Sequence, residues 1–193
     1  MSGSGKRSPG RIRIIGGQLR NSRLDVPDLP GLRPTAERVR ETLFNWLAPV
    51  IQGARCLDPC AGTGALGIEA WSRGAAAVQF VERDVSAAQA LRANLARLKV
   101  DGSQVVAADA TGFLQQAGQP HDLVFLDPPF ALDLWSVLAA LLEQGGWLAA
   151  QAWIYVESPR GVSPALPVNW RMHREGQAGE VRFALYRRAL PLS

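Results

Sequence analysis

The chain has 193 residues, a hydrophobic share of 47% and a net charge of +4. This length suits one domain with a substantial core and a small appendage. No segment approaches the length of a membrane span, and the polar residues 1–10 lack the apolar core of a signal peptide. We therefore expect a cytoplasmic protein that begins with a disordered basic arm at 1–10 and does not enter a membrane.

Two cysteines, Cys56 and Cys60, lie on a predicted strand and in the turn after it. No second cysteine pair or histidine cluster accompanies them, as the usual zinc spacings would require. We expect both thiols to be reduced and buried, and we predict no metal site.

The basic charge is concentrated near the N-terminus. Residues 1–40 carry a net charge of +6, and the rest of the chain carries −2. A solvated arm that only aids solubility would explain this excess. We favour a surface for phosphates, because arginine supplies most of the charge and suits bidentate contact with phosphate.

The first forty residues predict a β-hairpin followed by a helix. Two strands at 11–15 and 18–26 flank a glycine turn, and a proline-rich connection completes an N-terminal extension at 11–34. Thr35 is the predicted N-cap of a helix through Val50, whose apolar side chains recur at helical spacing. The arginines of the predicted hairpin are Arg11, Arg13, Arg20 and Arg23.

From residue 54 onward, short apolar segments alternate with helical patterns. We predict strands at 54–58, 77–82, 103–108, 121–127 and 152–158, and helices at 65–73, 85–98, 111–117 and 132–144. Two further strands, near 167–173 and 181–188, have no helix between them and should form an antiparallel pair. The pattern predicts an α/β fold in which a mostly parallel, Rossmann-like sheet of seven strands has helices on both faces, within a domain at 35–193.

The stretch from Leu57 to Gly67 joins the first strand of this sheet to a helix. The strand ends at Asp58, and a glycine-rich turn leads into the helical pattern. Such a unit is typical of a loop that holds a nucleotide-like ligand at a helix N-terminus. The spacing Gly62-x-Gly64-x-x-Gly67 also fits a dinucleotide loop, so the loop alone does not identify the ligand.

Four consecutive predicted strands end in a carboxylate: Asp58, Glu82, Asp109 and Asp127. Ligands of open α/β sheets bind beyond the carboxyl ends of the strands. Glu82 follows Gly62 at the spacing of an acid that accepts the hydroxyls of a ribose. Asp109 would lie at an adenine edge or would simply cap the next helix.

Asp127-Pro128-Pro129-Phe130 narrows the chemistry. The two prolines end a fully apolar strand and fix the backbone between an acid and an aromatic ring. The Asp127 carboxylate and a carbonyl of this turn can accept both N–H bonds of an exocyclic base amino group, which aims the nitrogen lone pair at an electrophile. Phe130 offers a face on which an extruded base can stack. The alternative is a plain strand terminator with a core phenylalanine.

These motifs, in this order, resemble the class I S-adenosylmethionine-dependent methyltransferases that modify base amino groups, and in particular the RsmD family. The similar segments are Arg13-Ile14-Ile15-Gly16-Gly17, Gly31-Leu32-Arg33-Pro34-Thr35, residues 39–47, residues 64–70 and Tyr155-Val156-Glu157. The resemblance covers residues 11–188. It implies methylation of the N2 amino group of one guanine in bacterial 16S ribosomal RNA, with S-adenosyl-L-methionine as cofactor and a small-subunit particle as substrate. We expect a monomer.

The resemblance also implies roles for individual residues. The guanine would be held by Asp127, Pro128, Pro129 and Phe130. The cofactor would be held by Asp58, Ala61, Gly62, Thr63, Gly64, Glu82, Arg83, Asp109 and Ala110, with Thr35, Arg38 and Arg40 closing over it. Arg40 would pair with the cofactor carboxylate, or else Arg38 and Arg40 lie on a solvated helix face. Pro59-Cys60 depart from the bulkier apolar pair expected beside the cofactor.

Three rival functions would each explain part of the sequence. A nicotinamide dehydrogenase commonly has a Tyr-x-x-x-Lys pair, and neither Lys6 nor Lys99 follows a tyrosine at that spacing. An inactive methyltransferase fold that serves as an RNA-binding assembly factor fits the basic segment but does not explain the intact acids. Methylation of adenine N6, in DNA or another RNA, suits Asp-Pro-Pro-Phe equally well, and only the N-terminal resemblance disfavours it.

Overall fold

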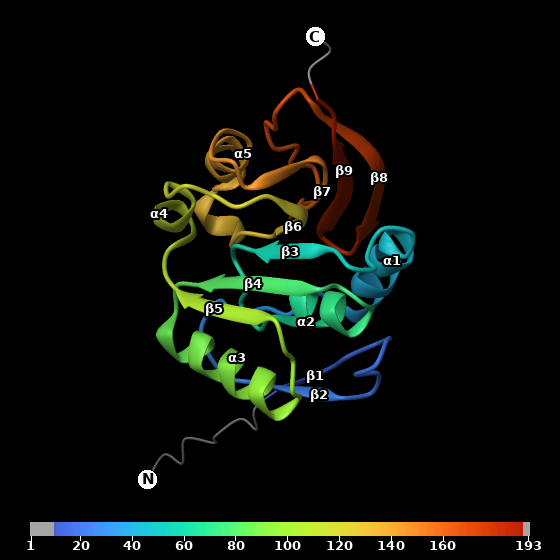
Figure 1. The fold of residues 1–193 in the computed structure, drawn as a ribbon, viewed down its shortest axis with the longest axis vertical. Helices are drawn as coiled ribbons and strands as arrows, with labels where there is room; N and C mark the ends of the chain where they lie inside the picture. The colour runs from blue at the N-terminus through green and yellow to red at the C-terminus, as the bar shows by residue number, and fades with distance from the viewer. Residues whose placement is uncertain (1–9, 191–193) are drawn as a thin grey trace.

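The computed structural model describes residues 10–190 and has a seven-stranded sheet with the order β5-β4-β3-β6-β7-β9-β8. Its strands are β3 (Arg55–Asp58), β4 (Ala77–Glu82), β5 (Ser103–Ala107), β6 (His121–Leu126), β7 (Leu148–Pro159), β8 (Trp170–Ala178) and β9 (Val181–Arg188). Strand β9 runs antiparallel to β7 and β8, and the other neighbouring pairs are parallel. The predicted fold class is therefore confirmed (Figure 1).

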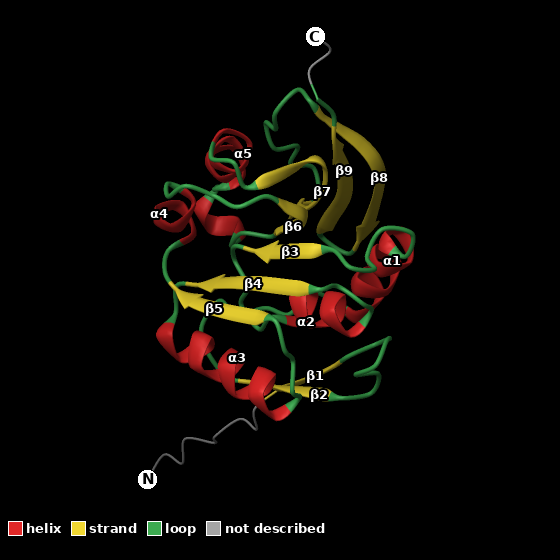
Figure 2. Cartoon of the chain, viewed as in Figure 1, coloured by secondary structure: helices red, strands yellow, loops and turns green. Residues whose placement is uncertain are grey.

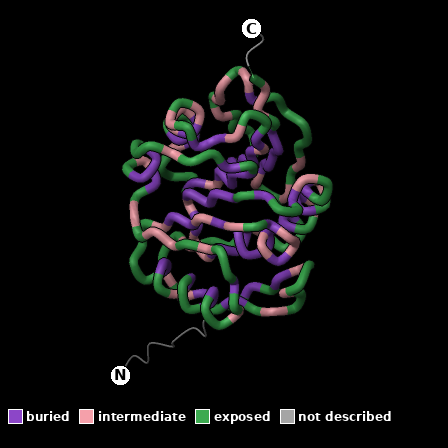
Figure 3. The backbone as a smooth tube through the Cα atoms, viewed as in Figure 1, coloured by how far each residue is buried: buried purple, intermediate pink, exposed green. Residues whose placement is uncertain are grey.

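Helices cover both faces of this sheet. They are α1 (Glu37–Leu47), α2 (Ala65–Ser72), α3 (Val85–Arg97), α4 (Ala110–Leu114) and α5 (Trp135–Gln144). Strand residues alternate between two apolar cores: Phe125 packs with α1, α2 and α3, whereas Val124 packs with α4 and α5. The central strands β3 and β6 are consequently mostly buried in the middle of the molecule, whereas the edge strands β5 and β8 are largely exposed or half-buried (Figures 2 and 3).

Several boundaries differ from the predictions. Strand β7 begins at Leu148 rather than near residue 152, and β8 continues to Ala178 through residues that were predicted to form a connection. Both extensions pair with neighbouring strands, and those hydrogen bonds are not visible in a local pattern. A 3₁₀ turn at Phe130–Leu132 precedes α5, so the predicted single helix from residue 132 starts later, at Trp135.

The predicted hairpin is present as a separate two-stranded sheet of β1 (Gly10–Arg13) and β2 (Arg23–Val26). Its strands are shorter than predicted, and the connection 14–22 is longer than a glycine turn. The hairpin packs on the helical layer: Ile12 and Leu24 are buried, and Asn94 of α3 bonds to both the N–H and the C=O of Asp25. Of the predicted arm, only Gly10 lies within the described residues, where it starts β1.

None of the helices within residues 10–190 is both long and apolar enough to cross a membrane.

Candidate active site

The glycine loop between β3 and α2 has a bare, sharply turned backbone. Gly62 and Gly64 adopt positive φ angles of 55° and 76°. A Cβ atom on Gly64 would lie 2.3 Å from the Leu91 side chain, so only glycine fits that position. Helix α2 starts directly after Gly64, which offers no side-chain cap; the Ala65 N–H donates to the Thr63 hydroxyl at 3.3 Å instead. The loop thus fits a polar ligand that approaches the backbone closely.

The structure brings the four strand-end carboxylates together. Burial raises the pKa of the Cys60 thiol, and the negative charges of all four acids raise it further: Asp58, Asp127, Glu82 and Asp109. Cys60 is partly buried in the turn after β3 and has a free thiol. The predicted convergence at the carboxyl edge of the sheet is therefore real, and this edge is where the arrowheads of β3, β4 and β5 point in Figure 1.

Asp58 is the deepest of these acids, at 2% exposure. Burial raises the pKa of its carboxyl group to about 8, and the nearby Glu82 charge adds to the shift, although a hydrogen bond from the Gly67 backbone opposes it. Asp58 therefore links the end of β3 to the first turn of α2 through the hydrogen bond from Gly67.

Glu82 and Asp109 already have backbone partners. The Glu82 carboxylate accepts the Gly62 N–H at 2.7 Å and the Asp84 N–H at 3.0 Å, which fixes its orientation beside the loop. Each of its oxygens retains a second lone pair for a ligand hydroxyl. Asp109 is exposed and accepts the Gly112 N–H at 3.0 Å as the N-cap of α4, the role that the sequence offered as its alternative.

The Asp127-Pro-Pro-Phe turn follows β6 without a break. Pro128 is buried, Pro129 leads into the 3₁₀ turn, and the Phe130 ring is 38% exposed. Phe130 leans against the buried Trp135, with ring centroids 5.8 Å apart. A large aromatic ring held at the surface on a packed indole is suited to stacking with a base, which a core phenylalanine would not be.

Thr35 lies among the carboxylates and does not cap α1. The helix begins at Glu37 after Ala36, with no side-chain cap, so the predicted N-cap was wrong. The Thr35 hydroxyl instead lies 3.4 Å from both Asp127 Oδ2 and Glu157 Oε2. The Tyr155 hydroxyl donates to the same Glu157 oxygen at 2.8 Å.

Glu157 is a site residue for which the sequence analysis predicted no role. It is 7% exposed on β7, next to Asp127. Burial raises the pKa values of both carboxyl groups, and the charge of Glu157 raises that of Asp127 further. The available signal was an acid that directly follows the apolar segment Ile154-Tyr155-Val156.

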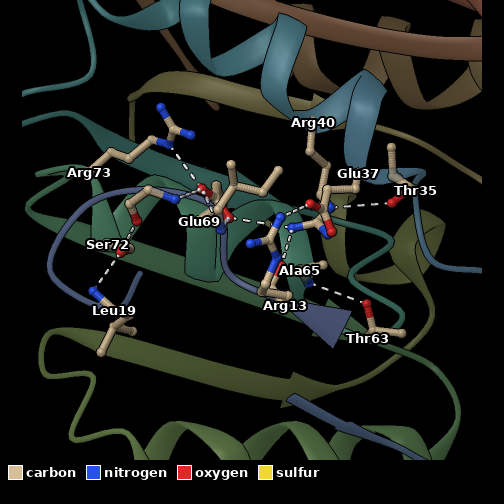
Figure 4. Close-up of polar contacts among 12 residues, drawn as sticks. Arg13, Leu19, Thr35, Glu37, Arg40, Thr63, Ala65, Glu69, Ser72 and Arg73 are labelled. Carbon is tan, nitrogen blue, oxygen red and sulfur yellow. Dashed lines mark hydrogen bonds and ion pairs between the residues drawn. The ribbon is translucent and has the colours of Figure 1, made fainter. Parts of the chain in front are cut away.

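The structure contradicts one of the two roles predicted for Arg40. Its side chain is 2% exposed, so it does not lie on a solvated helix face. Its guanidinium contacts Glu69 at 3.4 Å and donates to the carbonyl oxygens of Arg13 and Thr35 (Figure 4). These partners hold it in the interior between α1, α2 and the hairpin, and its pairing with the cofactor carboxylate stays a prediction.

Glu69 is the centre of this buried network and was also missed. It is fully buried on α2 and accepts the N–H groups of Ile15 and Gly16, as well as contacts from Arg40 and Arg73. One helical turn along α2, Ser72 adds hydrogen bonds to the same connection of the hairpin. Figure 4 shows this network of hydrogen bonds and ion pairs between α2, α1 and the hairpin.

The remaining predicted basic residues lie on the surface. All four of the following are exposed: Arg20, Arg23, Arg38 and Arg83. Arg11 pairs loosely with Asp25 at 3.6 Å, whereas Arg13 is closely paired with Glu37 on α1. Arg13 is therefore less available to phosphates than the other hairpin arginines.

The connection 27–36 runs from the hairpin to the glycine loop and the acids. A Cβ atom on Gly62 would lie 3.4 Å from Leu32, so this segment passes over the loop before it reaches Thr35. A cavity of about 260 Å³ lies under the start of this segment, lined by Gly10, Arg11, Ile12, Val26, Pro27, Asp28, Leu29, Leu32 and Pro34. None of the strand-end acids lines it, so we place the site at the sheet edge rather than in this cavity.

The chain is similar to known proteins over nearly its whole length. A family model described as conserved hypothetical protein 95 matches residues 12–187. Ribosomal RNA small subunit methyltransferase D of Escherichia coli (strain K12) is 56% identical over 180 residues, covering 93% of this chain and 91% of that protein. The protein of the same name from Haemophilus influenzae is 45% identical over 181 residues, covering 92% and 94%. A solved Escherichia coli structure described as a candidate methyltransferase, yhhF, has a TM-score of 0.87 at 52% identity, covering 94% and 99%.

Proposed function

We infer the function from one premise: the chain belongs to the family described as conserved hypothetical protein 95, the RsmD family of ribosomal RNA methyltransferases. It is a methyltransferase that acts on 16S ribosomal RNA, at the N2 amino group of a guanine. The observation that supports this chemistry best is the Asp127 carboxylate beside a rigid Pro-Pro-Phe turn, at the same sheet edge as the glycine loop.

We propose S-adenosyl-L-methionine as the cofactor. When bound, it supplies an electrophilic methyl group on a positively charged sulfur. The open backbone of Ala61, Gly62, Thr63 and Gly64 would hold its methionine part, and Glu82 would accept its ribose hydroxyls. Because the Asp109 side chain caps α4, we assign the adenine to the backbone of Asp109 and Ala110.

Asp127 and the turn after it would hold the reacting nitrogen. The carboxylate accepts one N–H of the guanine amino group, a carbonyl of the turn accepts the other, and Phe130 stacks on the ring. The N2 lone pair then forms the new bond to the methyl carbon, and the electrons of the broken carbon–sulfur bond remain on sulfur. N2 loses one proton, which the Asp127 carboxylate, with its raised pKa, would accept. Positioning and electrostatics supply the catalysis.

We propose that the extension at 11–34 contacts RNA through Arg11, Arg20 and Arg23. Arg11 and Arg23 alternate along their strands with the buried Ile12 and Leu24, and Arg20 lies exposed in the connection 14–22, so all three guanidinium groups are on the surface. Arg13 contributes less because Glu37 already pairs with it. We further propose an assembled small-subunit particle as substrate and a monomeric enzyme.

The test is to offer a labelled methyl donor to free 16S RNA, to small-subunit particles that lack the modification, and to DNA, and then to map the product. We expect N2-methylguanine at one position, formed fastest in the particles. Methylated adenine would indicate the rival amino-methyltransferase. Cofactor binding without any product would indicate the inactive assembly factor.

A further inference from the structure

The ends of β6 and β7 place two carboxylates side by side. Leu126 and Val156 are partners in the parallel ladder, so the next residues, Asp127 and Glu157, occupy equivalent places on neighbouring strands. Both follow an aromatic residue of the α1 face by two positions, and those two rings, Phe125 and Tyr155, are in edge contact at 6.4 Å. By strand alternation, both carboxylates point to the same side of the sheet.

The Thr35 hydroxyl confirms that the two carboxylates are close together. It lies 3.4 Å from an oxygen of each, so these oxygens are separated by no more than twice that distance. Each side chain also has a second carboxylate oxygen, so acceptors from both residues lie within reach of one small ligand. The two carboxylates are thus close enough to contact the same ligand.

Glu157 is held rigidly but retains a free oxygen. Its Oε2 accepts the Tyr155 hydroxyl at 2.8 Å, and its backbone carbonyl accepts the Trp135 indole N–H, also at 2.8 Å. Within residues 10–190, its other oxygen, Oε1, has no hydrogen-bond partner, and it is not among the atoms sealed from solvent. A side chain that is only 7% exposed thus presents one unpartnered acceptor to the site.

Two acceptors at this place match one purine and repel another. Guanine presents the N1–H beside its N2 amino group, so adjacent positions of its edge are both donors. Adenine presents its N6 amino group beside N1, which is an acceptor with a lone pair and no proton. A second carboxylate opposite that position therefore gains a hydrogen bond from guanine and opposes a lone pair in adenine.

We propose that Glu157 is a specificity-determining residue that accepts the N1–H of the target guanine through Oε1, while Asp127 accepts a hydrogen of N2. This assignment rests on the proposed function and adds the reason why the enzyme selects guanine over adenine. Trp135 links the two parts of the base site, because the same side chain supports Phe130 and fixes the Glu157 backbone.

The test replaces the target guanine by 2-aminopurine in the RNA substrate. This base keeps the 2-amino group that is methylated but has an unprotonated N1. We expect the wild-type enzyme to favour guanine by about 100-fold in kcat/KM, in line with the discrimination supplied by one well-placed polar contact to a base edge. A wild-type ratio near one overturns the proposal, whereas a failure to methylate guanine at all overturns the proposed function itself.

Glu157→Gln identifies the residue responsible. The amide can donate to the N1 of 2-aminopurine, so we expect the preference for guanine to fall by at least about tenfold while cofactor binding is unchanged. Glu180→Gln, the same substitution at an exposed position between β8 and β9, is the control and should keep the wild-type ratio. Equal loss on both substrates, with the ratio unchanged, would assign Glu157 a merely structural role and overturn the proposal.

Glu157→Asp decides the question if the glutamine variant does not fold, which a cofactor titration reports. Its carboxylate is one methylene shorter and stands farther from the N1–H. The ratio should therefore fall clearly below that of the wild type, and an unchanged ratio overturns the proposal.

Discussion

Two groups of carboxylates in this protein, buried or partly buried, have opposite surroundings. Glu69, in the network between α2 and the hairpin, is fully buried and accepts hydrogen bonds from two backbone N–H groups and two arginines. Asp127 and Glu157, at the sheet edge, receive only hydroxyl donors, and one of these, Thr35, is shared at 3.4 Å. Within residues 10–190, neither of the latter two forms an ion pair.

The difference shows how the chain separates structure from function. A buried carboxylate whose oxygens all accept hydrogen bonds from the protein has none left for a ligand. Glu69 therefore serves to hold the hairpin in place. An undersatisfied carboxylate is costly to bury as an ion, as the raised pKa values of Asp127 and Glu157 show. That cost is recovered when a substrate supplies the missing donors.

The largest effect is expected when the Asp127 carboxylate, which has few hydrogen-bond donors, is removed. Asp127→Ala should lower methyl transfer by about 1000-fold or more, because the reacting nitrogen loses its acceptor. Cofactor binding, measured by titration, should remain nearly intact. Asp101→Ala, the same substitution at an exposed position in the turn before β5, should have no effect. Loss of cofactor binding in the Asp127 variant would show that its role is misassigned.

The next largest effect is expected at Glu69, whose carboxylate has a full set of hydrogen-bond donors. Glu69→Gln leaves the buried Arg40 without its counter-ion and should reduce the free energy of unfolding by about 3–5 kcal/mol. Urea denaturation measures this loss. Glu37→Gln, which breaks an exposed pair with Arg13, should cost far less. Similar losses in the two variants would contradict the central role of Glu69.

A smaller, pH-dependent effect is expected at Asp58. Its carboxyl pKa is about 8 in the folded state against 3.8 as the reference value, so between these limits the folded state binds more protons than the unfolded state. This group therefore lowers wild-type stability as pH rises through that window, by at most about 1.4 kcal/mol per pH unit. Asp58→Asn should gain stability over the wild type at pH 8 and lose that advantage near pH 4, as judged by unfolding midpoints. Parallel pH profiles of the two proteins would refute the assignment.

The smallest effect is expected on RNA binding by the surface of the hairpin, which the contacts of Glu69 hold in place. Replacing Arg11, Arg20 and Arg23 by Gln should weaken RNA binding and reduce the slope of log K against log salt by about 0.7 for each phosphate that is no longer neutralised. Arg13→Gln should change the slope less, because Glu37 pairs with Arg13. Binding measured at several salt concentrations gives both slopes. An unchanged slope in the triple variant would show that the hairpin arginines do not contact phosphates and that the hairpin has only a structural role.

Local patterns in the sequence predicted the frame of the site correctly. The order of strands and helices follows from apolar periodicity, and Gly64 is required by a turn that is local in the chain. The convergence of Asp58, Glu82, Asp109 and Asp127 follows from the general rule that parallel strands share one carboxyl edge. The helix-cap role of Asp109 was likewise one of two local options.

The errors concern side chains whose partners are distant in the sequence. Thr35 has the composition of an N-cap, yet its hydroxyl meets Asp127 and Glu157, which are 92 and 122 residues away. Arg40 looks like a surface residue of an amphipathic helix, yet it meets Glu69 from 29 residues away. No local rule contains such contacts.

The sequence by itself determined the parallel sheet, the glycine loop and the acidic edge, since periodicity, backbone freedom and strand polarity act over a few residues. Only the tertiary structure decided which carboxylate has a full set of hydrogen-bond donors and which keeps acceptors free for a ligand. That outcome depends on the donors that α1, the hairpin and β7 bring to each carboxylate once they pack together. It separates Glu69, which stabilises the fold, from Asp127 and Glu157, which remain free for a substrate.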